Sequence, residues 1–80
     1  MNNNKLHIGE LIRAKLDENG QKVSWLAEKV FCSRSNFYRI LEKDEINLNL
    51  LWRISCVLHF DFFACISDKF KADEAEQKQQ

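Results

Sequence analysis

The side chains best suited to chemistry lie close together between positions 34 and 39: Arg34, Ser35, Asn36, Tyr38 and Arg39. An arginine can donate two hydrogen bonds to O6 and N7 of guanine, and an asparagine can pair in the same way with N6 and N7 of adenine. Each such pair contributes roughly 1–3 kcal/mol of discrimination between bases. A second role is open to Asn36, because an asparagine in the first turn of a helix can also help to cap it.

Two short amphipathic helices would position these side chains, both within the segment VSWLAEKVFCSRSNFYRILEK (23–43). We expect the first within residues 23–30, where either Ser24 is the N-cap or the helix begins a residue or two earlier. We expect the second over about 34–42, with Ser33 as its N-cap. The inward-facing residues are expected to be Leu26, Ala27, Val30, Phe37 and Ile40, with Leu41 partly inward. Ala27 places a small residue where the two helices would cross. This is the sequence form of a helix-turn-helix, whose second helix enters the major groove of DNA.

Three further amphipathic segments complete an all-α chain. A helix over 6–19 ends at Asn19-Gly20, a left-handed stop, and helices at 48–58 and after residue 61 are capped by Asn47 and Asp61. Their inward-facing residues are expected to be Ile8, Leu11, Ile12 and Leu16, then Leu48, Leu51, Ile54, Ser55 and Leu58, and last Phe62, Cys65 and Ile66. Beyond residue 67 the chain is polar. We therefore expect one domain over 1–67 and a tail over 68–80 that is either a frayed helix or disordered.

The charge is unevenly distributed along the chain. The whole sequence has a net charge of zero, but residues 22–43 hold five basic and two acidic residues, a net charge of +3. Residues 68–80 hold four acidic and three basic residues, a net charge of −1. Lys22, Ser24 and Lys43 are therefore candidates for contacts with phosphate. A neutral chain binds nucleic acid weakly as a monomer, so we expect a dimer or a second partner.

Composition excludes several classes of protein. Eighty residues, 45% of them hydrophobic, suffice for one small domain, and no apolar run approaches the roughly 20 residues of a membrane span. The N-terminal MNNNKLHIGE lacks the apolar core of a signal peptide, so we expect a soluble cytoplasmic protein. No pattern of catalytic residues or phosphate-binding loop indicates an enzyme, and none indicates a cofactor.

The three cysteines, Cys32, Cys56 and Cys65, form no CxxC pair, and we expect free thiols packed as small apolar side chains. The alternative is a metal site formed by Cys56, His59 and Cys65. Its spacing matches no common zinc pattern, and only three ligands are in sight. We therefore expect no metal.

A family resemblance rests on Leu26-Ala27-Glu28-Lys29, on Ser33-Arg34-Ser35 followed by Phe37 and Ile40, and on LNLLWRISCVLHFDFFACI (48–66). Over about residues 8–67 the chain resembles the lambda-repressor-like helix-turn-helix family, the Cro and phage-repressor type often called XRE. The resemblance implies a compact five-helix domain, sequence-specific binding of double-stranded DNA, transcriptional regulation and a homodimer. It also implies that residues 34–36, Tyr38 and Arg39 reach bases or flanking phosphates.

Two positions depart from the family pattern. Phe31 stands where the family usually has a glycine in the turn, so either the turn differs or Phe31 is strained. Val23 stands where the family often has a phosphate-binding glutamine. The chain is also rich in apolar residues that exceed the expected inward faces: Val23, Trp25, Phe31, Trp52, Cys56 and Phe63. They either fill the core or form an interface. The zero net charge, Phe31 and Val23 motivate a second hypothesis, a protein-interaction module of the same fold, such as an antitoxin-like or phage-encoded partner, with weak or no DNA binding.

Overall fold

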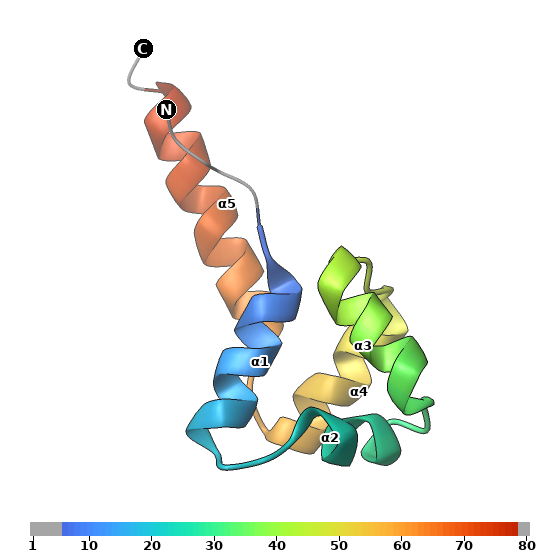
Figure 1. Cartoon of the computed structure of the whole chain (residues 1–80). Helices are drawn as coiled ribbons and strands as arrows, with labels where there is room; N and C mark the ends of the chain where they lie inside the picture. The colour runs from blue at the N-terminus through green and yellow to red at the C-terminus, as the bar shows by residue number, and fades with distance from the viewer. Residues whose placement is uncertain (1–5, 79–80) are drawn as a thin grey trace.

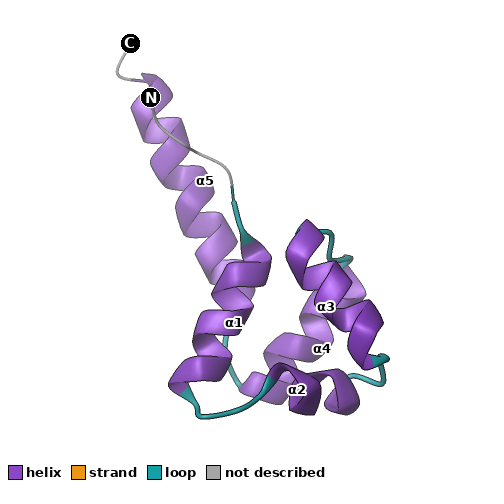
Figure 2. Cartoon of the chain, viewed as in Figure 1, coloured by secondary structure: helices purple, strands orange, loops and turns teal. Residues whose placement is uncertain are grey.

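Five α-helices joined by short links make up the part of the chain that the computed structural model describes: residues 6–78, with side chains described for residues 6–75 (Figure 1). The helices are α1 (Ile8–Glu18), α2 (Val23–Lys29), α3 (Arg34–Lys43), α4 (Leu48–Leu58) and α5 (Phe62–Lys78). No strand occurs among these residues (Figure 2), so the prediction of an all-α chain is confirmed.

Within residues 6–78 no single helix is long and apolar enough to cross a membrane. Only α4 and α5 taken together, with a bend of 117° between them, have that length and composition.

Side-chain caps define where the last three helices begin. Ser33, Asn47 and Asp61 each accept a hydrogen bond from the backbone N–H three residues later, at 3.3, 2.7 and 3.1 Å respectively. These bonds satisfy N–H groups that the first turn of a helix leaves without an intrahelical partner. All three predicted caps are confirmed.

The first four helices end in the same kind of left-handed turn, in which a residue shortly after the helix has a positive φ: Gly20 (71°), Phe31 (59°), Asp44 (59°) and His59 (53°). After α2, the N–H of Phe31 donates to the carbonyl of Glu28 at 3.1 Å, and the N–H of Cys32 donates to that of Ala27 at 2.9 Å. This pattern satisfies carbonyls of the last helical turn. Phe31 thus adopts a backbone conformation that glycine adopts readily, although its Cβ disfavours it.

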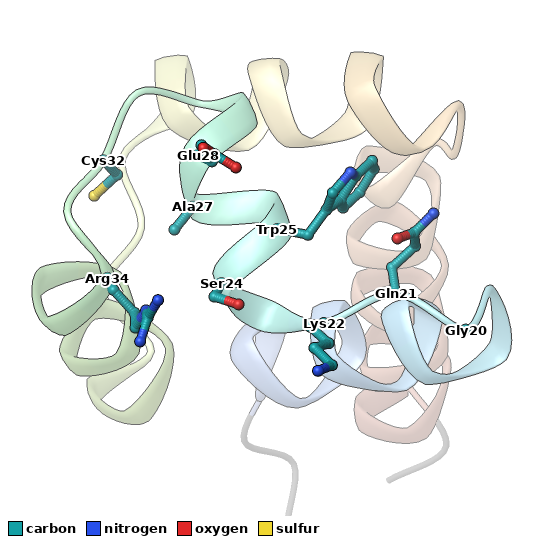
Figure 3. Close-up of a pocket in the computed structure, with 9 residues that line it drawn as sticks. All are labelled: Gly20, Gln21, Lys22, Ser24, Trp25, Ala27, Glu28, Cys32 and Arg34. Atoms are coloured by element: carbon teal, nitrogen blue, oxygen red, sulfur yellow. The ribbon is translucent and has the colours of Figure 1, made fainter.

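All five helices contribute to one core, formed by Ile8, Ile12, Leu16, Leu26, Ala27, Val30, Phe37, Leu41, Leu51, Ile54, Leu58 and Phe62. Ala27 points from α2 toward α3 (Figure 3) and is only 2% exposed, so the small residue lies at the contact between these helices. Its predicted place is therefore confirmed. In α3, Leu41 is buried more deeply than Ile40, which reverses the predicted order of these two residues.

Two residues predicted for the core lie at its edge instead. Leu48 is 72% exposed and Leu11 is 36% exposed. The buried face of α4 passes through Leu51, Ile54 and Leu58, so its helical period places Leu48 on a flank, one turn before Trp52. Ser55 lies on the same flank, half-buried, and its hydroxyl donates to the carbonyl of Leu51 at 2.9 Å.

The beginning of α1 packs directly against the end of α3. The carboxylate of Asp44 accepts a hydrogen bond from the backbone N–H of Gly9 at 2.7 Å and contacts Nδ1 of His7 at 2.9 Å. Asp44 therefore caps α1 from a distant part of the chain, which compensates for the lack of a side-chain cap at the N-cap residue His7. A Cβ on Gly9 would lie 2.1 Å from the carbonyl oxygen of Leu41, so the two backbones approach closely only because residue 9 is glycine.

α5 is the longest helix and extends past the rest of the molecule (Figure 1). With α5 included, the molecule measures 46 × 23 × 23 Å along its principal axes. Its first residue, Phe62, is buried, whereas Phe70 is largely exposed. The predicted boundary at residue 67 falls inside this helix, whose residues 68–78 are α-helical. This part is rich in alanine, glutamate, lysine and glutamine, which favour helices. The division into a domain and a tail stays a prediction. Residues 1–5 and 79–80 of the predicted domain and tail lie outside the described residues.

Candidate nucleic-acid interface

The outer face of α3 carries most of the side chains predicted to contact DNA. Phe37 and Leu41 are buried on the opposite face, which fixes how the helix is rotated about its own axis. Five predicted residues are consequently exposed: Arg34, Ser35, Tyr38, Arg39 and Lys43. Lys43 lies near the end of the helix, where it borders a small hollow together with Arg39. α3 therefore presents one polar face with three cationic side chains and one acidic side chain, Glu42. We refer to it as the α3 face.

Asn36 is half-buried and is engaged within the molecule. Its Nδ2 donates to Sγ of Cys32 at 3.5 Å, and its Oδ1 accepts a hydrogen bond from Nη2 of Arg39 at 2.8 Å. Its backbone N–H donates to the Ser33 cap. The carboxamide thus links the turn to Arg39 and holds that guanidinium in place. Pairing of Asn36 with an adenine would require these bonds to be exchanged.

The cations of the α3 face are not neutralised by acidic side chains of the described residues. The ion pairs within residues 6–75 join His7 to Asp44, Lys15 to Glu18 and Lys69 to Asp73. Arg34 points from the start of α3 into the space beside Ser24 and Ala27 of α2 (Figure 3). The positive charge on this side of the molecule is therefore available to an external anion.

Two adjoining hollows lie where α1, α2 and α3 meet. The first, of about 570 Å³, is lined by residues that include Lys22, Ser24 and Arg34 (Figure 3). The second, of about 500 Å³, shares Lys22 and Ser24 with the first and adds Arg13 and Tyr38. The structure thus brings the predicted phosphate contacts Lys22 and Ser24 next to two residues of the α3 face. It does not bring Lys43 to these hollows.

Two arginines outside α2 and α3 also contact this pair of helices, and neither was predicted to do so. The guanidinium of Arg13 on α1 lies over the ring of Tyr38, with Cζ 5.7 Å from the ring centroid. Nη1 of Arg53 on α4 donates to the carbonyl of Val30, at the end of α2, at 3.3 Å. The sequence pattern places both arginines on polar helix faces. Their contacts depend on how α1 and α4 pack against the motif, which that pattern does not reveal.

A second surface, on α4 and α5, is apolar. Trp52 is 64% exposed, and its ring packs against that of Phe63 with 6.1 Å between centroids. These two residues border a hollow of about 440 Å³, the α4–α5 groove, which is also lined by Ser55, Cys56, His59, Phe60 and Asp61.

All three cysteines are free thiols. Among the described residues no three His, Cys, Asp or Glu side chains lie so that they could hold a metal ion.

These two surfaces, one cationic and one apolar, lie on different helices. The first offers donors to an anion, and the second offers exposed aromatic rings to an apolar partner. Comparison with protein-family models, with curated proteins and with solved structures gives no match for this chain.

Proposed function

We propose that this protein is a sequence-specific DNA-binding transcriptional regulator of the lambda-repressor-like type, acting as a repressor. In this proposal α2 and α3 form a helix-turn-helix, and α3 enters the major groove of double-stranded DNA. Arg34, Ser35, Tyr38 and Arg39 contact base edges and nearby phosphates, and Asn36 orients Arg39. Lys22, Ser24 and Lys43 contact phosphates of the DNA backbone. The protein acts by binding alone, without catalysis or a cofactor.

The observation that carries the proposal is the free cationic α3 face. Its arginines are exposed and are not ion-paired with the described acidic side chains, and the opposite face of the helix is anchored by buried Phe37 and Leu41. A helix that is already fixed loses little conformational entropy when it docks. Arg39 is further ordered by its hydrogen bond to Asn36. Such a surface suits an extended anion that carries hydrogen-bond acceptors in fixed positions, as the major groove of DNA does.

A homodimer formed through the α4–α5 groove is the second part of the proposal. The groove is bordered by Trp52 and Phe63, and Leu48 adds exposed apolar surface on the same flank of α4. A contiguous exposed patch with an aromatic residue at its centre is typical of protein interfaces. A two-fold dimer there would place two α3 helices about 34 Å apart, one turn of DNA, on a partly palindromic operator. Pairing two subunits also doubles the number of cationic contacts available to a chain of zero net charge.

Fluorescence anisotropy with a labelled random-sequence duplex tests DNA binding directly. We expect the affinity to fall linearly with salt on logarithmic axes, because lysines and arginines that neutralise phosphates release bound counterions. Non-specific duplex binding is expected in the micromolar range, with a Kd of about 10⁻⁶–10⁻⁴ M. No binding at about 10⁻⁴ M protein, together with no dependence on salt, would contradict the proposal.

The variants Arg34→Ala and Arg39→Ala test whether the α3 face reads sequence. Each is expected to lose about 1–3 kcal/mol of discrimination at one or two base positions, measured by selection from a random duplex library. Lys71→Ala is the matched control, because Lys71 is an exposed cation on α5, away from the α3 face. An unchanged sequence preference in both arginine variants, with the fold intact by circular dichroism, would exclude them from recognition.

A protein-interaction module is the second candidate, and one observation favours it. The ring of Phe31 is 90% exposed at the tip of the turn between α2 and α3, next to the surface proposed to face DNA. Exposed aromatic rings frequently anchor protein interfaces. This candidate predicts a complex with a second protein that survives high salt and that Phe31→Gly weakens, because an apolar contact is little affected by ionic strength.

A further inference from the structure

Arg13 lies outside the helix-turn-helix, on the face of α1 that is turned toward α3. Its guanidinium carbon is 5.7 Å from the centroid of the Tyr38 ring, within the range of a cation–π contact. The side chain of Arg13 is half-buried, so the contact restricts it more than a lysine or arginine in open solvent would be restricted. The contact places the guanidinium beside the α3 face, and Arg13 also borders a hollow lined by Glu10, Glu42 and Asp44.

The hollow beside Arg13 is lined by donors from three helices. Lys22 and Ser24 contribute an ammonium and a hydroxyl from the start of α2, and Tyr38 contributes a phenol from α3. Asp17 is the one carboxylate that lines it, and Arg13 forms no ion pair with it or with any other described acidic side chain. The hollow shares Lys22 and Ser24 with the one that Arg34 and Glu28 border. Figure 3 shows the hollow that Arg34 borders.

From this arrangement we infer that Arg13 is a phosphate-binding residue, and that the hollow between α1, α2 and α3 takes a phosphodiester of the DNA strand flanking the bases that α3 reads. Tyr38 acts as the positioning residue that holds the guanidinium. The inference rests on the proposed function and extends the DNA-binding surface to α1. A guanidinium is suited to this task because its planar N–H groups can donate two parallel hydrogen bonds to phosphate oxygens.

The chain supplies a matched control on the same helix. Lys15 carries the same charge as Arg13, but its Nζ lies 4.1 Å from the centroid of the Phe60 ring and pairs with Glu18 at 2.7 Å. Phe60 lines the α4–α5 groove, so Lys15 faces a different part of the molecule. Arg13→Gln and Lys15→Gln therefore change the net charge equally, and only the first removes a cation from the proposed phosphate site.

The experiment measures the binding of both variants to a labelled random-sequence duplex between about 50 and 200 mM KCl. Arg13→Gln is expected to weaken binding about tenfold at low salt and to reduce the slope of log K against log salt by about 0.9, the contribution of one phosphate contact. Lys15→Gln should leave the slope unchanged. Arg13→Lys should restore most of the slope, because it keeps the charge.

Combining Arg13→Gln with Tyr38→Ala tests the positioning role. Removal of the Tyr38 ring should weaken binding less in the Arg13→Gln background than in the wild type, because the ring then has no guanidinium to hold. Equal slopes for Arg13→Gln and Lys15→Gln, with wild-type binding intact, would overturn the phosphate site and leave the proposed function standing. A wild-type protein that does not bind duplex would overturn both.

Discussion

Phe31 combines two features that are each unfavourable in an isolated domain. It has a φ of 59°, which costs a non-glycine residue roughly 1–2 kcal/mol, and its apolar ring is 90% exposed to water. Asp44 also has a φ of 59°, but aspartate tolerates this region better, and its carboxylate is hydrogen-bonded to Gly9. The ring of Phe31 contributes nothing comparable, because it does not pack in the core. The backbone of Phe31 is strained and its ring stays exposed to water, and we propose that the ring contacts a partner molecule.

Replacing Phe31 with glycine should therefore stabilise the protein. Phe31→Gly is expected to raise the free energy of unfolding by about 1 kcal/mol, since glycine adopts positive φ without strain. The corresponding rise in Tm, followed by circular dichroism, is roughly 4–8 °C for a domain of this size. Asp44→Gly is the comparison: it also relieves the backbone, but it removes the cap of α1 and should lower Tm. A lower Tm for Phe31→Gly would mean that the ring stabilises the fold.

At the scale of helices, the contact between α1 and α3 positions both Arg13 and the α3 face. It depends on Gly9, because any Cβ there would lie 2.1 Å from the carbonyl oxygen of Leu41 and 2.9 Å from its carbonyl carbon. Both atoms belong to the backbone and cannot move aside as the end of a side chain can. Asp44, the C-cap of α3, also links the two helices at this point, because its carboxylate accepts a hydrogen bond from the N–H of Gly9.

Gly9→Ala should consequently push α1 away from α3. We expect a loss of about 1–3 kcal/mol in the free energy of unfolding, the usual effect of overpacking, despite the better helix propensity of alanine. Urea denaturation followed by tryptophan fluorescence measures it. The neighbouring Glu10→Ala serves as the control, because Glu10 is exposed and its removal should change stability by less than about 0.5 kcal/mol. Equal stability of the two variants would show that α1 can shift without loss.

The sequence predicts helix starts well and helix packing less well. Ser33, Asn47 and Asp61 cap helices by accepting hydrogen bonds from backbone N–H groups three residues later, so the local sequence is enough to predict their role. Gly9 and Arg13 owe their roles to the crossing of α1 over α3, and periodicity along one helix does not contain that information. Leu48 was assigned to the core for the same reason: hydrophobicity shows that a residue can be buried, but packing decides which flank of the helix is covered.

The same distinction applies to the candidate site, where the sequence predicts which side chains are exposed but not which of them contact one another. The exposure of Arg34, Ser35, Tyr38 and Arg39 follows from the period of α3 once its buried face is known, and it was predicted from that period. The hydrogen bonds of Asn36 with Cys32 and Arg39 were not predicted, because a side chain that can donate and accept hydrogen bonds to a base can equally form them with its neighbours. For Phe31 the sequence left two alternatives, a different turn or a strained residue. Its positive φ and the backbone hydrogen bonds of the turn show the second.

At the scale of the whole molecule, the cationic surface and the apolar surface belong to different helices. The former is formed by α1, α2 and α3, and the latter by α4 and α5. A second subunit can therefore cover the α4–α5 groove while the α3 face stays open. This separation allows dimer formation and DNA binding to reinforce each other: each subunit that docks brings a second set of phosphate contacts to the same duplex.

Trp52→Glu tests this coupling. A charge in the middle of the apolar patch should convert the proposed dimer to a monomer, as measured by sedimentation velocity, and weaken binding to a palindromic duplex by at least about tenfold. Phe70→Glu is the control, because it places the same charge at another exposed aromatic residue, one that does not line the α4–α5 groove. A Trp52→Glu protein with unchanged sedimentation and unchanged DNA affinity would argue against an interface at the α4–α5 groove.

The short links between the helices, at 19–22, 30–33, 44–47 and 59–61, also affect how the chain reaches its native state. Little loop entropy must be lost before neighbouring helices meet, and the chain contains no proline whose isomerisation would add a slow step. Relaxation after a laser temperature jump should follow a single exponential, on the microsecond-to-millisecond timescale of about 10⁻⁶–10⁻³ s that is typical of helical domains. A molecule that unfolds briefly would then recover its shape far faster than it could be replaced by new synthesis.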